Sequence, residues 1–386
     1  MFIIEKPYIS EYLVDTIINH DWAVLDNETI EDSGIEEGAF NLWSAEEAVD
    51  YYQKQEFPLI YSNSENAISW VYENLPKSNL VSYIKFFKDK IGFREKLKDH
   101  YPNFKFQSIE YLDINYVNKE DFSYPLVIKP SVGFLGFGVH IIKSVEDWEQ
   151  EVKNLHKEIA TTKSLYSQNV VDSTNILIED FVEGEHFSID AYFDRNGTPV
   201  IMNIYKDLRA DEKEVKGKLY CTSPSIMVQY MAKFTQLLRD ISDISGVKNF
   251  PMQLEVKITP NGDIFPMEAK PLQFACWCSS DIAKFAWGFN IYEYFHSQIH
   301  PDWNEILSNA TKDIYYYSIL RVPDDFPKST IRSFDYDEYL RNFPNVIELR
   351  RVNYQDNSVF GVVFGKAEDE KALHSILKTD IKKYIK

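Results

Sequence analysis

The chain has 386 residues, of which 44% are hydrophobic and 15% aromatic, so it is globular and has enough apolar residues for a sizeable core. Its net charge of −19 argues against non-specific binding to nucleic acid or anionic membranes, and its three cysteines argue against a disulfide framework. There is no signal peptide and no run long enough to span a membrane, so we expect a cytoplasmic protein with no nucleic-acid or membrane partner.

The N-terminal part alternates strand and helix patterns. Residues 2–5 (FIIE) have the pattern of a short buried strand, a helix is predicted from Ser10 to His20, and WAVLDN resumes as a strand. This order predicts a small α/β layer. The first turn, KPYIS, has no glycine, which argues against a dinucleotide site there. Two helical patterns follow and end at Pro102, and we place a first boundary near residue 88.

The middle of the chain, between residues 120 and 275, mostly predicts antiparallel hairpins flanked by helices, an α+β pattern. Helices are predicted from Ser144 and over residues 225–245, and a further strand and a closing helix are predicted beyond Trp303. The predicted strands of the middle part are 124–130, 139–143, 187–194, 199–207 and the two arms of 252–271, and residues 176–184 are apolar and then acidic.

A glycine-rich segment, PSVGFLGFG, separates two predicted strands and contains Gly133, Gly136 and Gly138. A dinucleotide loop runs from a strand into a helix, whereas a second strand follows here, so we interpret the segment as a flap between antiparallel strands. Such a flap offers backbone N–H groups to phosphate oxygens, and Lys129 would add a positive charge beside them. Taken alone, a flexible hairpin tip with a solvated lysine explains the segment equally well.

Residues 252–271, MQLEVKITPNGDIFPMEAKP, predict a hairpin, because an Asn-Gly pair between strand patterns is the strongest short-range signal for a two-residue turn. The register set by this turn places Glu255 directly opposite Glu268, and Lys257 opposite Pro266. Opposed like charges destabilise a sheet, but Mg²⁺ is commonly held by one or two carboxylates plus phosphates. The flap and the acidic hairpin would then both bind Mg-ATP. A solvated face with cross-strand Glu–Lys contacts is the alternative, and a bulge near the turn would shift the register.

The ordered set of these motifs resembles the ATP-grasp superfamily. The resemblance rests on YPLVIKPSVGFLGFGV, ILIEDFVEGEHFSID, MQLEVKIT and FPMEAKP, and it extends over about residues 1–300. It implies a mixed α/β and α+β fold, with an N-terminal Rossmann-like pre-ATP-grasp domain over residues 1–88. An ATP-grasp domain over residues 89–303 would follow, with an antiparallel-sheet core and a lid at about 120–184. Residues 304–386 would form a C-terminal lobe.

The resemblance assigns nucleotide-binding roles to three segments. Lys129 would hold the α- and β-phosphates with help from Lys90, and the glycine flap would close over the triphosphate. Glu179 would accept a hydrogen bond from the exocyclic amine of adenine, beside backbone groups of the hinge that follows. His186 stands where the family usually has a ribose-binding glutamate. The expected nucleotide-binding set is Lys90, Lys129, Gly133, Gly136, Gly138, Glu179, Phe181, Val182 and His186.

The same resemblance assigns metal-binding and catalytic roles. Glu255 and Glu268 would ligate Mg²⁺, with Mn²⁺ as an alternative. Lys206 resembles a catalytic lysine near the γ-phosphate, although a surface lysine at a strand end is nearly as good an interpretation. The family often ends this hairpin with E-x-N-P-R, whereas this chain has Lys270 for the asparagine and Leu272 for the arginine. We assign Lys270 a catalytic role as a substitute positive charge, but it would equally fit an altered or lost activity.

The implied function is that of an ATP-dependent carboxylate–amine ligase, similar to the L-amino acid ligase and carbamoyl-phosphate-synthetase-like branch. Its partners would be a small-molecule carboxylate and an amine, joined through an acyl phosphate, and a homodimer is compatible with the resemblance. Two alternatives stay open. One is a small-molecule kinase on the same fold, and the other is a nucleotide-binding protein that has lost turnover.

Other candidate sites carry weaker signals. His296 and His300 have the spacing of a zinc-binding helix face but no glutamate between them of the kind that such a motif contains. The CWC sequence at residues 276–278 lacks the spacing of a zinc site, so we expect it to be structural. Residues 93–100 mix charges as a solvated helix face does.

Overall fold

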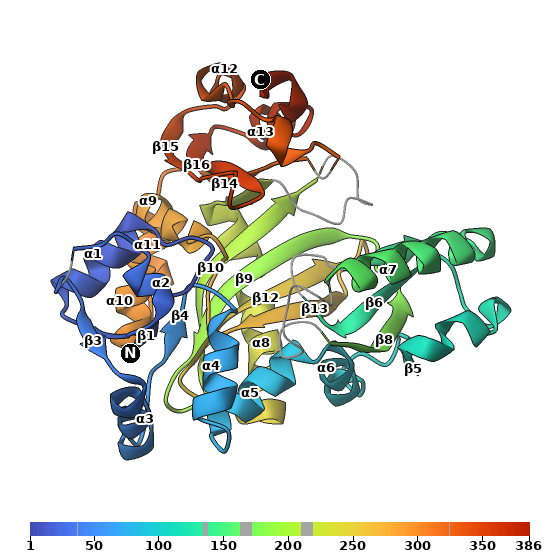
Figure 1. Ribbon diagram of the computed structural model, residues 1–386, viewed down its shortest axis with the longest axis horizontal. Coiled ribbons are helices and arrows are strands. Elements are labelled where there is room, and N and C mark those ends of the chain that lie inside the picture. The colour runs from blue at the N-terminus through green and yellow to red at the C-terminus, as the bar shows by residue number, and fades with distance from the viewer. Residues whose placement is uncertain (37, 134–137, 163–171, 210–218, 324) are drawn as a thin grey trace.

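The computed structural model describes residues 1–36, 38–133, 138–162, 172–209, 219–323 and 325–386. These residues form three sheets with helices packed around them (Figure 1). None of the helices in these ranges is both long enough and apolar enough to cross a membrane.

The N-terminal sheet is parallel and has the strand order β3-β2-β1-β4. Its first elements confirm the predicted strand–helix–strand layer. The helix α1 begins after Ser10, whose hydroxyl accepts a hydrogen bond from the backbone N–H of Leu13 at 3.1 Å. The strands are β1 Phe2–Ile3, β2 Ala23–Leu25, β3 Asn41–Trp43 and β4 Tyr61–Ser62. The helices are α1 Glu11–Asn19, α2 Glu28–Glu31, α3 Ala45–Lys54, α4 Ala67–Asn74, α5 Asn79–Lys88 and α6 Lys90–Leu97.

A second sheet, which we call the lid sheet, is antiparallel and has the order β5-β8-β6-β7. The antiparallel pairing of β6 with β7 confirms that the glycine-rich segment connects two strands of one hairpin. The helix α7 buries Trp148, Val152 and Leu155 with residues of this sheet in a separate small core. The strands are β5 Phe106–Glu110, β6 Leu126–Val132, β7 His140–Ile142 and β8 Asp172–Asp180. The helices are η1 Tyr111–Tyr116, η2 Lys119–Asp121, η3 Val145–Asp147 and α7 Trp148–Thr162.

The central sheet has eight antiparallel strands in the order β13-β12-β9-β10-β11-β14-β16-β15. Its last three strands come from the C-terminal region, so residues predicted as a separate lobe extend this sheet. The strands are β9 Glu185–Phe193, β10 Pro199–Leu208, β11 Leu219–Thr222, β12 Phe250–Ile258, β13 Ile264–Pro271, β14 Ile314–Arg321, β15 Val346–Arg351 and β16 Val359–Ala367.

The long helix α8, Pro224–Ser245, covers one face of the central sheet, as the amphipathic pattern predicted. Ser223 caps its first turn, and Gly246 ends it in the left-handed conformation with φ of 64°. The remaining helices are η4 Ser279–Asp281, α9 Ile282–Trp287, α10 Ile291–His296, α11 Trp303–Asn309, η5 Lys328–Thr330, α12 Tyr336–Leu340, α13 Glu370–Leu377 and η6 Ile381–Tyr384.

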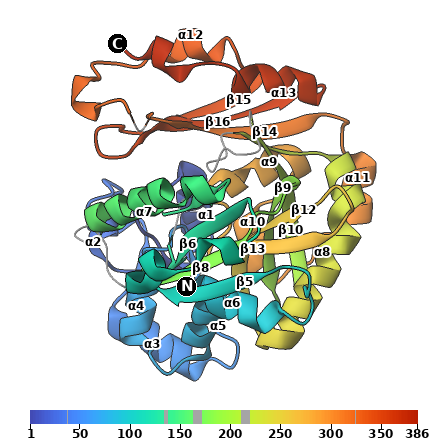
Figure 2. The same ribbon diagram turned by 90° about the vertical axis from the view of Figure 1, so that its right-hand side faces the viewer.

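The two faces of the central sheet differ in chemistry, because side chains alternate along each strand. Phe187 of β9 and Phe234 of α8 are buried together, with ring centroids 5.8 Å apart. In Figure 2 the central strands lie between α8 on one side and the lid sheet on the other. The alternate positions of β9, β12 and β13 are polar, and they are His186, Ser188, Asp190, Gln253, Glu255, Glu268 and Lys270.

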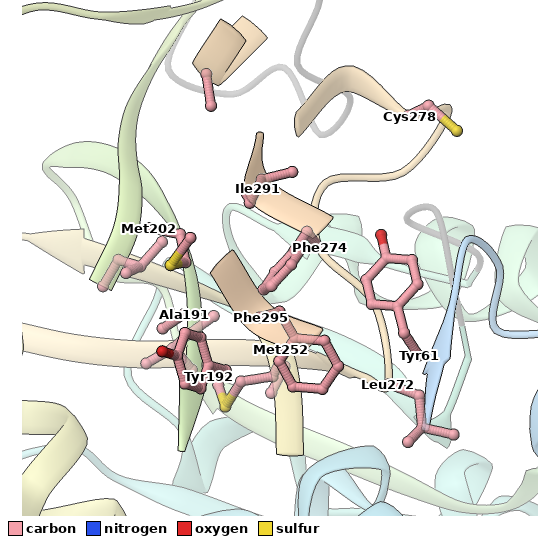
Figure 3. Packing of buried hydrophobic residues seen from close by; sticks show 14 of the residues in the cluster. Tyr61, Ala191, Tyr192, Met202, Met252, Leu272, Phe274, Cys278, Ile291 and Phe295 are labelled. Carbon is pink, nitrogen blue, oxygen red and sulfur yellow. The ribbon is translucent and has the colours of Figure 1, made fainter. Parts of the chain in front are cut away.

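The N-terminal sheet joins the central sheet through a buried aromatic cluster (Figure 3). The ring of Tyr61 on β4 lies 5.4 Å from that of Phe274, which in turn lies 6.1 Å from that of Phe295 on α10. Leu272 belongs to the same cluster, and its carbonyl accepts a hydrogen bond from the N–H of Ser62 at 2.8 Å. The end of β13 is thus anchored on the N-terminal sheet.

Candidate functional site

The acidic hairpin has the predicted pairing at its centre. Glu255 of β12 lies directly opposite Glu268 of β13. A bulge displaces the register immediately beyond this pair, so Val256 lies opposite Pro266, and Lys257 lies opposite Phe265. The prediction that Lys257 lies opposite Pro266 is therefore wrong, because Thr259 and Asp263 close the turn and shift the register by one residue, and the bulge restores it only at Glu255.

Each glutamate of this pair contacts cations, which explains how the sheet holds two opposed carboxylates. The Glu255 carboxylate lies 2.6 Å from Lys270 Nζ and 3.3 Å from His186 Nε2. The Glu268 carboxylate lies 3.1 Å from Lys90 Nζ. Burial raises the pKa of both carboxyl groups. Lys270 and His186 together outweigh it for Glu255, and Lys90, Lys270 and Lys88 together outweigh it for Glu268, so both pKa values lie below 4.5. Both groups are therefore carboxylates at neutral pH.

A second charged cluster connects the lid sheet with the acidic hairpin. Lys129 of β6 and Arg94 of α6 contact opposite oxygens of Glu179 on β8, at 2.6 Å and 2.9 Å. Arg94 also donates hydrogen bonds to the carbonyls of Pro266 and Met267, at 2.7 Å and 2.9 Å. Sequence reasoning missed Arg94 because residues 93–100 look like a solvated helix face; Arg94 is in fact 3% exposed.

The pKa values in this cluster follow from burial and mutual attraction. Burial raises the pKa of Glu179, but Arg94 and Lys129 outweigh it, so the pKa falls below its ordinary value. Burial lowers the pKa of Lys129, and the neighbouring Arg94 and Lys90 add to this effect against the attraction of Glu179. Lys129 is thus a buried cation that a further negative group would stabilise.

The described part of the glycine flap contacts two lysines, Lys88 and Lys90. The Gly133 carbonyl accepts hydrogen bonds from Lys88 at 3.1 Å and from Lys90 at 3.4 Å. Lys88 also contacts Glu65 of the N-terminal region at 2.7 Å. The backbone N–H of Gly138 donates to a side-chain oxygen of Glu158 at 2.9 Å. The tip, including Gly136, lies outside the described residues.

The hinge between β8 and β9 carries the predicted adenine contacts. The N–H of Phe181 donates to the carbonyl of Pro125 at 3.3 Å, and the carbonyl of Val182 accepts from Lys257 at 2.7 Å. Lys257 also lies 4.7 Å above the Phe181 ring. These two backbone groups therefore already have partners within the protein.

A cavity of about 380 Å³ opens beside this hinge. His186 at its wall lies 2.8 Å from Asp207 Oδ2, and Arg209 donates to the same oxygen at 2.8 Å. The pKa of His186 is lowered by burial but raised more by Asp207 and Glu255, so it lies above 6.5. Asp207 Oδ1 is buried with no hydrogen-bond partner among the described residues. The cavity lining consists of Gly184, Glu185, His186, Lys206, Asp207, Leu208, Arg209, Lys257, Ile258, Thr259, Pro260 and His374.

Lys206 does not join the two glutamates. On β10, Lys206 and the adjacent Asp207 point to opposite faces of the sheet. Asp207 contacts His186 on the polar face, whereas Lys206 lies opposite Phe187 of β9 on the face covered by α8. Its ammonium contacts Glu185 at 2.9 Å and Glu370 of α13 at 3.2 Å. The strand turns the Lys206 side chain to the face opposite that of the two glutamates, and a role for Lys206 near the γ-phosphate stays a prediction.

Lys270 and Leu272, the two residues that depart from the E-x-N-P-R pattern, have different surroundings. Lys270 is on the polar face and contacts both Glu255 and Gln253, the latter at 3.1 Å. Leu272 is fully buried in the aromatic cluster of Figure 3, with φ of 64°. Its side chain packs in the core between the sheets. Lys270 is therefore the departure that changes the charge of the site.

The donor set of the acidic pair fits Mg²⁺ in part. Carboxylate oxygens are the ligands that Mg²⁺ prefers, and it is usually bound through one or two of them together with phosphates and waters. Within the described ranges, no group of three or more His, Cys, Asp or Glu side chains is arranged to hold a metal ion. The same finding covers His296 and His300; His296 stacks on Trp22 instead, with ring centroids 4.1 Å apart.

Comparisons with known proteins agree with this geometry. The sequence model of the ATP-grasp domain matches residues 122–281. No curated protein matches the sequence. Among solved structures, L-amino acid ligase from Bacillus licheniformis is 14% identical with a TM-score of 0.66, and the match covers 100% of this chain and 97% of that chain.

Two further structures are similar over nearly the whole chain. N5-carboxyaminoimidazole ribonucleotide synthetase from Thermotoga maritima is 14% identical with a TM-score of 0.61, covering 100% of this chain and 98% of that chain. The second is the biotin carboxylase domain of 2-oxoglutarate carboxylase from Hydrogenobacter thermophilus, solved with MgADP and bicarbonate. It is 12% identical with a TM-score of 0.62, and the match covers 95% of this chain and 86% of that chain. Residues 122–281 therefore match the ATP-grasp domain, and the chain shares its fold with these structures over its whole length.

Proposed function

We propose that this protein is an ATP-dependent carboxylate–amine ligase that forms an amide bond through an acyl phosphate. The observation that carries the proposal is the opposition of Glu255 and Glu268 next to a buried set of cations, Lys90, Lys129 and Lys270. Carboxylates for a metal thus lie in contact with Lys90 and Lys270, and Lys129 lies close enough to Lys90 for the two charges to interact. The fold, which it shares with an L-amino acid ligase, supports this class of reaction.

The nucleotide would bind between the hinge and the acidic pair. Lys129 and Lys90 would contact its phosphates, and the flap from Gly133 to Gly138 would cover them. His186 and the cavity beside it would receive the ribose. Glu179 would orient Lys129, with which it forms a buried ion pair.

Glu255 and Glu268 would hold Mg²⁺, or Mn²⁺ in its place. The metal would supply neutralisation of charge on the phosphates. A carboxylate oxygen of the first substrate attacks the γ-phosphorus, and the bond from that phosphorus to the oxygen of the ADP leaving group breaks. The amine nitrogen of the second substrate then attacks the carbonyl carbon, phosphate leaves, and the nitrogen loses a proton to solvent. Lys90, Lys129 and Lys270 would position and neutralise the transferred phosphoryl group.

The domain division belongs to this proposal. Residues 1–88 would form the pre-ATP-grasp domain, residues 89–303 the ATP-grasp domain with the lid at about 120–184, and residues 304–386 the C-terminal lobe. Within the described ranges, β5 also pairs with the lid sheet, and the C-terminal strands complete the central sheet. The lobe would therefore support the nucleotide site through β14 and α13.

The test is a substrate screen in which amino acids and other carboxylates are combined pairwise with amines, with phosphate release as the first readout. Hydroxylamine added in place of the amine should trap the acyl phosphate as a hydroxamate. Glu268→Gln should abolish the metal-dependent release, because it removes one of two metal-binding carboxylates. Full activity of this variant would contradict the assignment.

The outcomes separate the alternatives. ADP release that requires both a carboxylate and an amine supports ligation. A phosphorylated product formed without any amine would make the protein a small-molecule kinase. Nucleotide binding without ADP release across the whole screen would identify a binding protein without turnover.

A further inference from the structure

The two lysines next to the acidic pair are held in different ways. Lys270 lies on β13, two residues from Glu268 and on the same face, and its ammonium reaches across the hairpin to Glu255 at 2.6 Å. It also donates to the amide oxygen of Gln253 at 3.1 Å, while the amide nitrogen of Gln253 lies 3.3 Å from Asp190. Lys90 comes from α6 and makes longer contacts with its acceptors.

Lys270 is therefore built into the sheet. Its side chain is 12% exposed, and each of its acceptors lies on the neighbouring strand β12. The Asp190 carboxylate that holds Gln253 also accepts from Tyr205 at 2.8 Å, and it is fully buried. This chain of contacts fixes the ammonium beside one oxygen of Glu255, and His186 lies beside the other oxygen.

A divalent ion that bridges the two glutamates would have to approach these cations. Glu255 already contacts Lys270 and His186, and Glu268 already contacts Lys90. Two carboxylates alone are a small donor set, and the described residues offer no third acidic or histidine ligand in a metal-binding group. Repulsion from the lysines and the lack of ligands both oppose binding of a free metal ion. A polyphosphate would reverse both effects, because it supplies oxygen ligands and negative charge.

We propose that Lys270 is a built-in cation that makes divalent-metal binding at Glu255 and Glu268 conditional on the nucleotide. In the free protein it neutralises Glu255, as Lys90 does Glu268. When the nucleotide binds, its phosphates bring the ligands and the charge that allow a metal ion to join. The inference rests on the proposed function for the nucleotide, but its first half concerns the free protein alone.

The experiment is a titration of the full-length protein with Mn²⁺, followed by the electron paramagnetic resonance signal of free Mn²⁺. We expect the wild-type protein to bind Mn²⁺ at least about tenfold more tightly with a non-hydrolysable ATP analogue than without it. Lys270→Gln keeps a hydrogen-bond donor near Gln253 but removes the charge. It should bind Mn²⁺ without nucleotide at least about tenfold more tightly than the wild type does.

Three further variants sharpen the test. Lys366→Gln removes the same charge from a lysine paired with Asp313 on the surface, and it should bind Mn²⁺ as the wild type does. Lys270→Met should behave as Lys270→Gln does, which separates the loss of charge from the new amide. The double variant Glu255→Gln, Lys270→Gln should not show the increase in nucleotide-free Mn²⁺ affinity. Circular dichroism of each variant checks that it is folded.

Two results would overturn the proposal. One is equal Mn²⁺ affinity of the wild type with and without the nucleotide analogue, in a sample that binds the analogue. The other is unchanged nucleotide-free Mn²⁺ affinity in both folded Lys270 variants. If the analogue itself does not bind, the proposed function fails, whereas the comparison of wild type and variants without nucleotide still reports on Lys270.

Discussion

Lys129 illustrates at the residue scale how the site holds buried charges. It is 5% exposed, and it shares the fully enclosed Glu179 carboxylate with Arg94. An isolated buried charge costs several kcal/mol, so each member of this cluster depends on the others. A nucleotide phosphate that approaches Lys129 would offer it a second anion. The cluster thus holds a buried cation inside the lid sheet.

Replacing Lys129 by Met should reduce ATP affinity by at least about a hundredfold, because it removes a desolvated phosphate contact. It should also lower the free energy of unfolding, since Glu179 keeps only Arg94 as a partner. Isothermal titration with ATP and urea unfolding measure the two effects. Lys129→Met combined with Glu179→Gln should recover stability but not ATP affinity. Wild-type affinity in the folded single variant would show that Lys129 does not bind the nucleotide.

Asp190 makes stability depend on pH. Burial raises its pKa from 3.8 to about 7, although Tyr205 and Gln253 hydrogen-bond its carboxyl group. The folded state therefore keeps the proton at pH values where the unfolded state has lost it. The contribution of this group to the free energy of unfolding is thus greatest below pH 4, falls as the pH rises toward 7, and changes by about 4 kcal/mol in total.

Asp190→Asn should remove the decrease in the free energy of unfolding that the raised pKa of Asp190 causes between pH 4 and pH 7. Urea unfolding of the wild type and the variant between pH 4 and pH 8 measures it, and the wild type should lose stability relative to the variant up to about pH 7. Parallel pH profiles of the two proteins would contradict the raised pKa of Asp190.

At the scale of elements, two irregularities shape the site. The bulge in β13 turns the successive carbonyls of Pro266 and Met267 toward Arg94, which donates to both of them. The hinge between β8 and β9 depends on Gly184, whose φ is 145°. A Cβ atom there would lie 2.1 Å from the carbonyl oxygen of Ile258 at the end of β12. The hinge can approach β12 because this residue has no side chain.

Gly184→Ala should therefore lower the free energy of unfolding by about 2 kcal/mol or more and weaken nucleotide binding at the adjacent cavity. Gly288→Ala is the matched control, because Gly288 has φ of 75° but open space around the added atom. The control should cost about 1 kcal/mol and leave nucleotide binding unchanged. Thermal unfolding and nucleotide titration of both variants provide the comparison; equal effects would show that the close approach to Ile258 carries no extra cost.

For the whole molecule, one buried ion pair connects distant parts of the chain. Arg350 of β15 contacts Asp281, which follows the hairpin, at 2.6 Å, and the two side chains are 8% and 0% exposed. Tyr292 of α10 also donates to Asp281, so the C-terminal strands and the segment behind the acidic hairpin share one buried group. The placement of the C-terminal strands and of the site are therefore coupled.

Arg350→Met should lower the free energy of unfolding by about 3–5 kcal/mol, because Asp281 would stay buried without its cation. Combining it with Asp281→Asn should restore part of the loss. Arg341→Met, which breaks an exposed pair with Glu338, should change stability by less than about 1 kcal/mol. Denaturant unfolding of the four proteins tests this, and similar losses for Arg350→Met and Arg341→Met would refute it.

The sequence by itself determined the features that local chemistry controls. The Asn-Gly signal and the strand patterns around it predicted the hairpin of β12 and β13, and the pairing of Glu255 with Glu268 also depends on the bulge between Glu255 and Val256. The strand that follows the glycine-rich segment identified it as a hairpin flap. The amphipathic pattern of residues 225–245 likewise predicted the helix α8, Pro224–Ser245.

Only the tertiary structure decided which charges meet and which face each strand presents. Lys206 could not be assigned to a face because β10 is buried on both sides, so its pattern carries no alternation. Arg94 looked solvated because its partners, Glu179 and two carbonyls of β13, lie far away in the chain. The pairing of β14 with β11 was hidden for the same reason. Turn geometry and strand period act between neighbours, whereas the burial of a charge depends on partners that only the folded chain brings together.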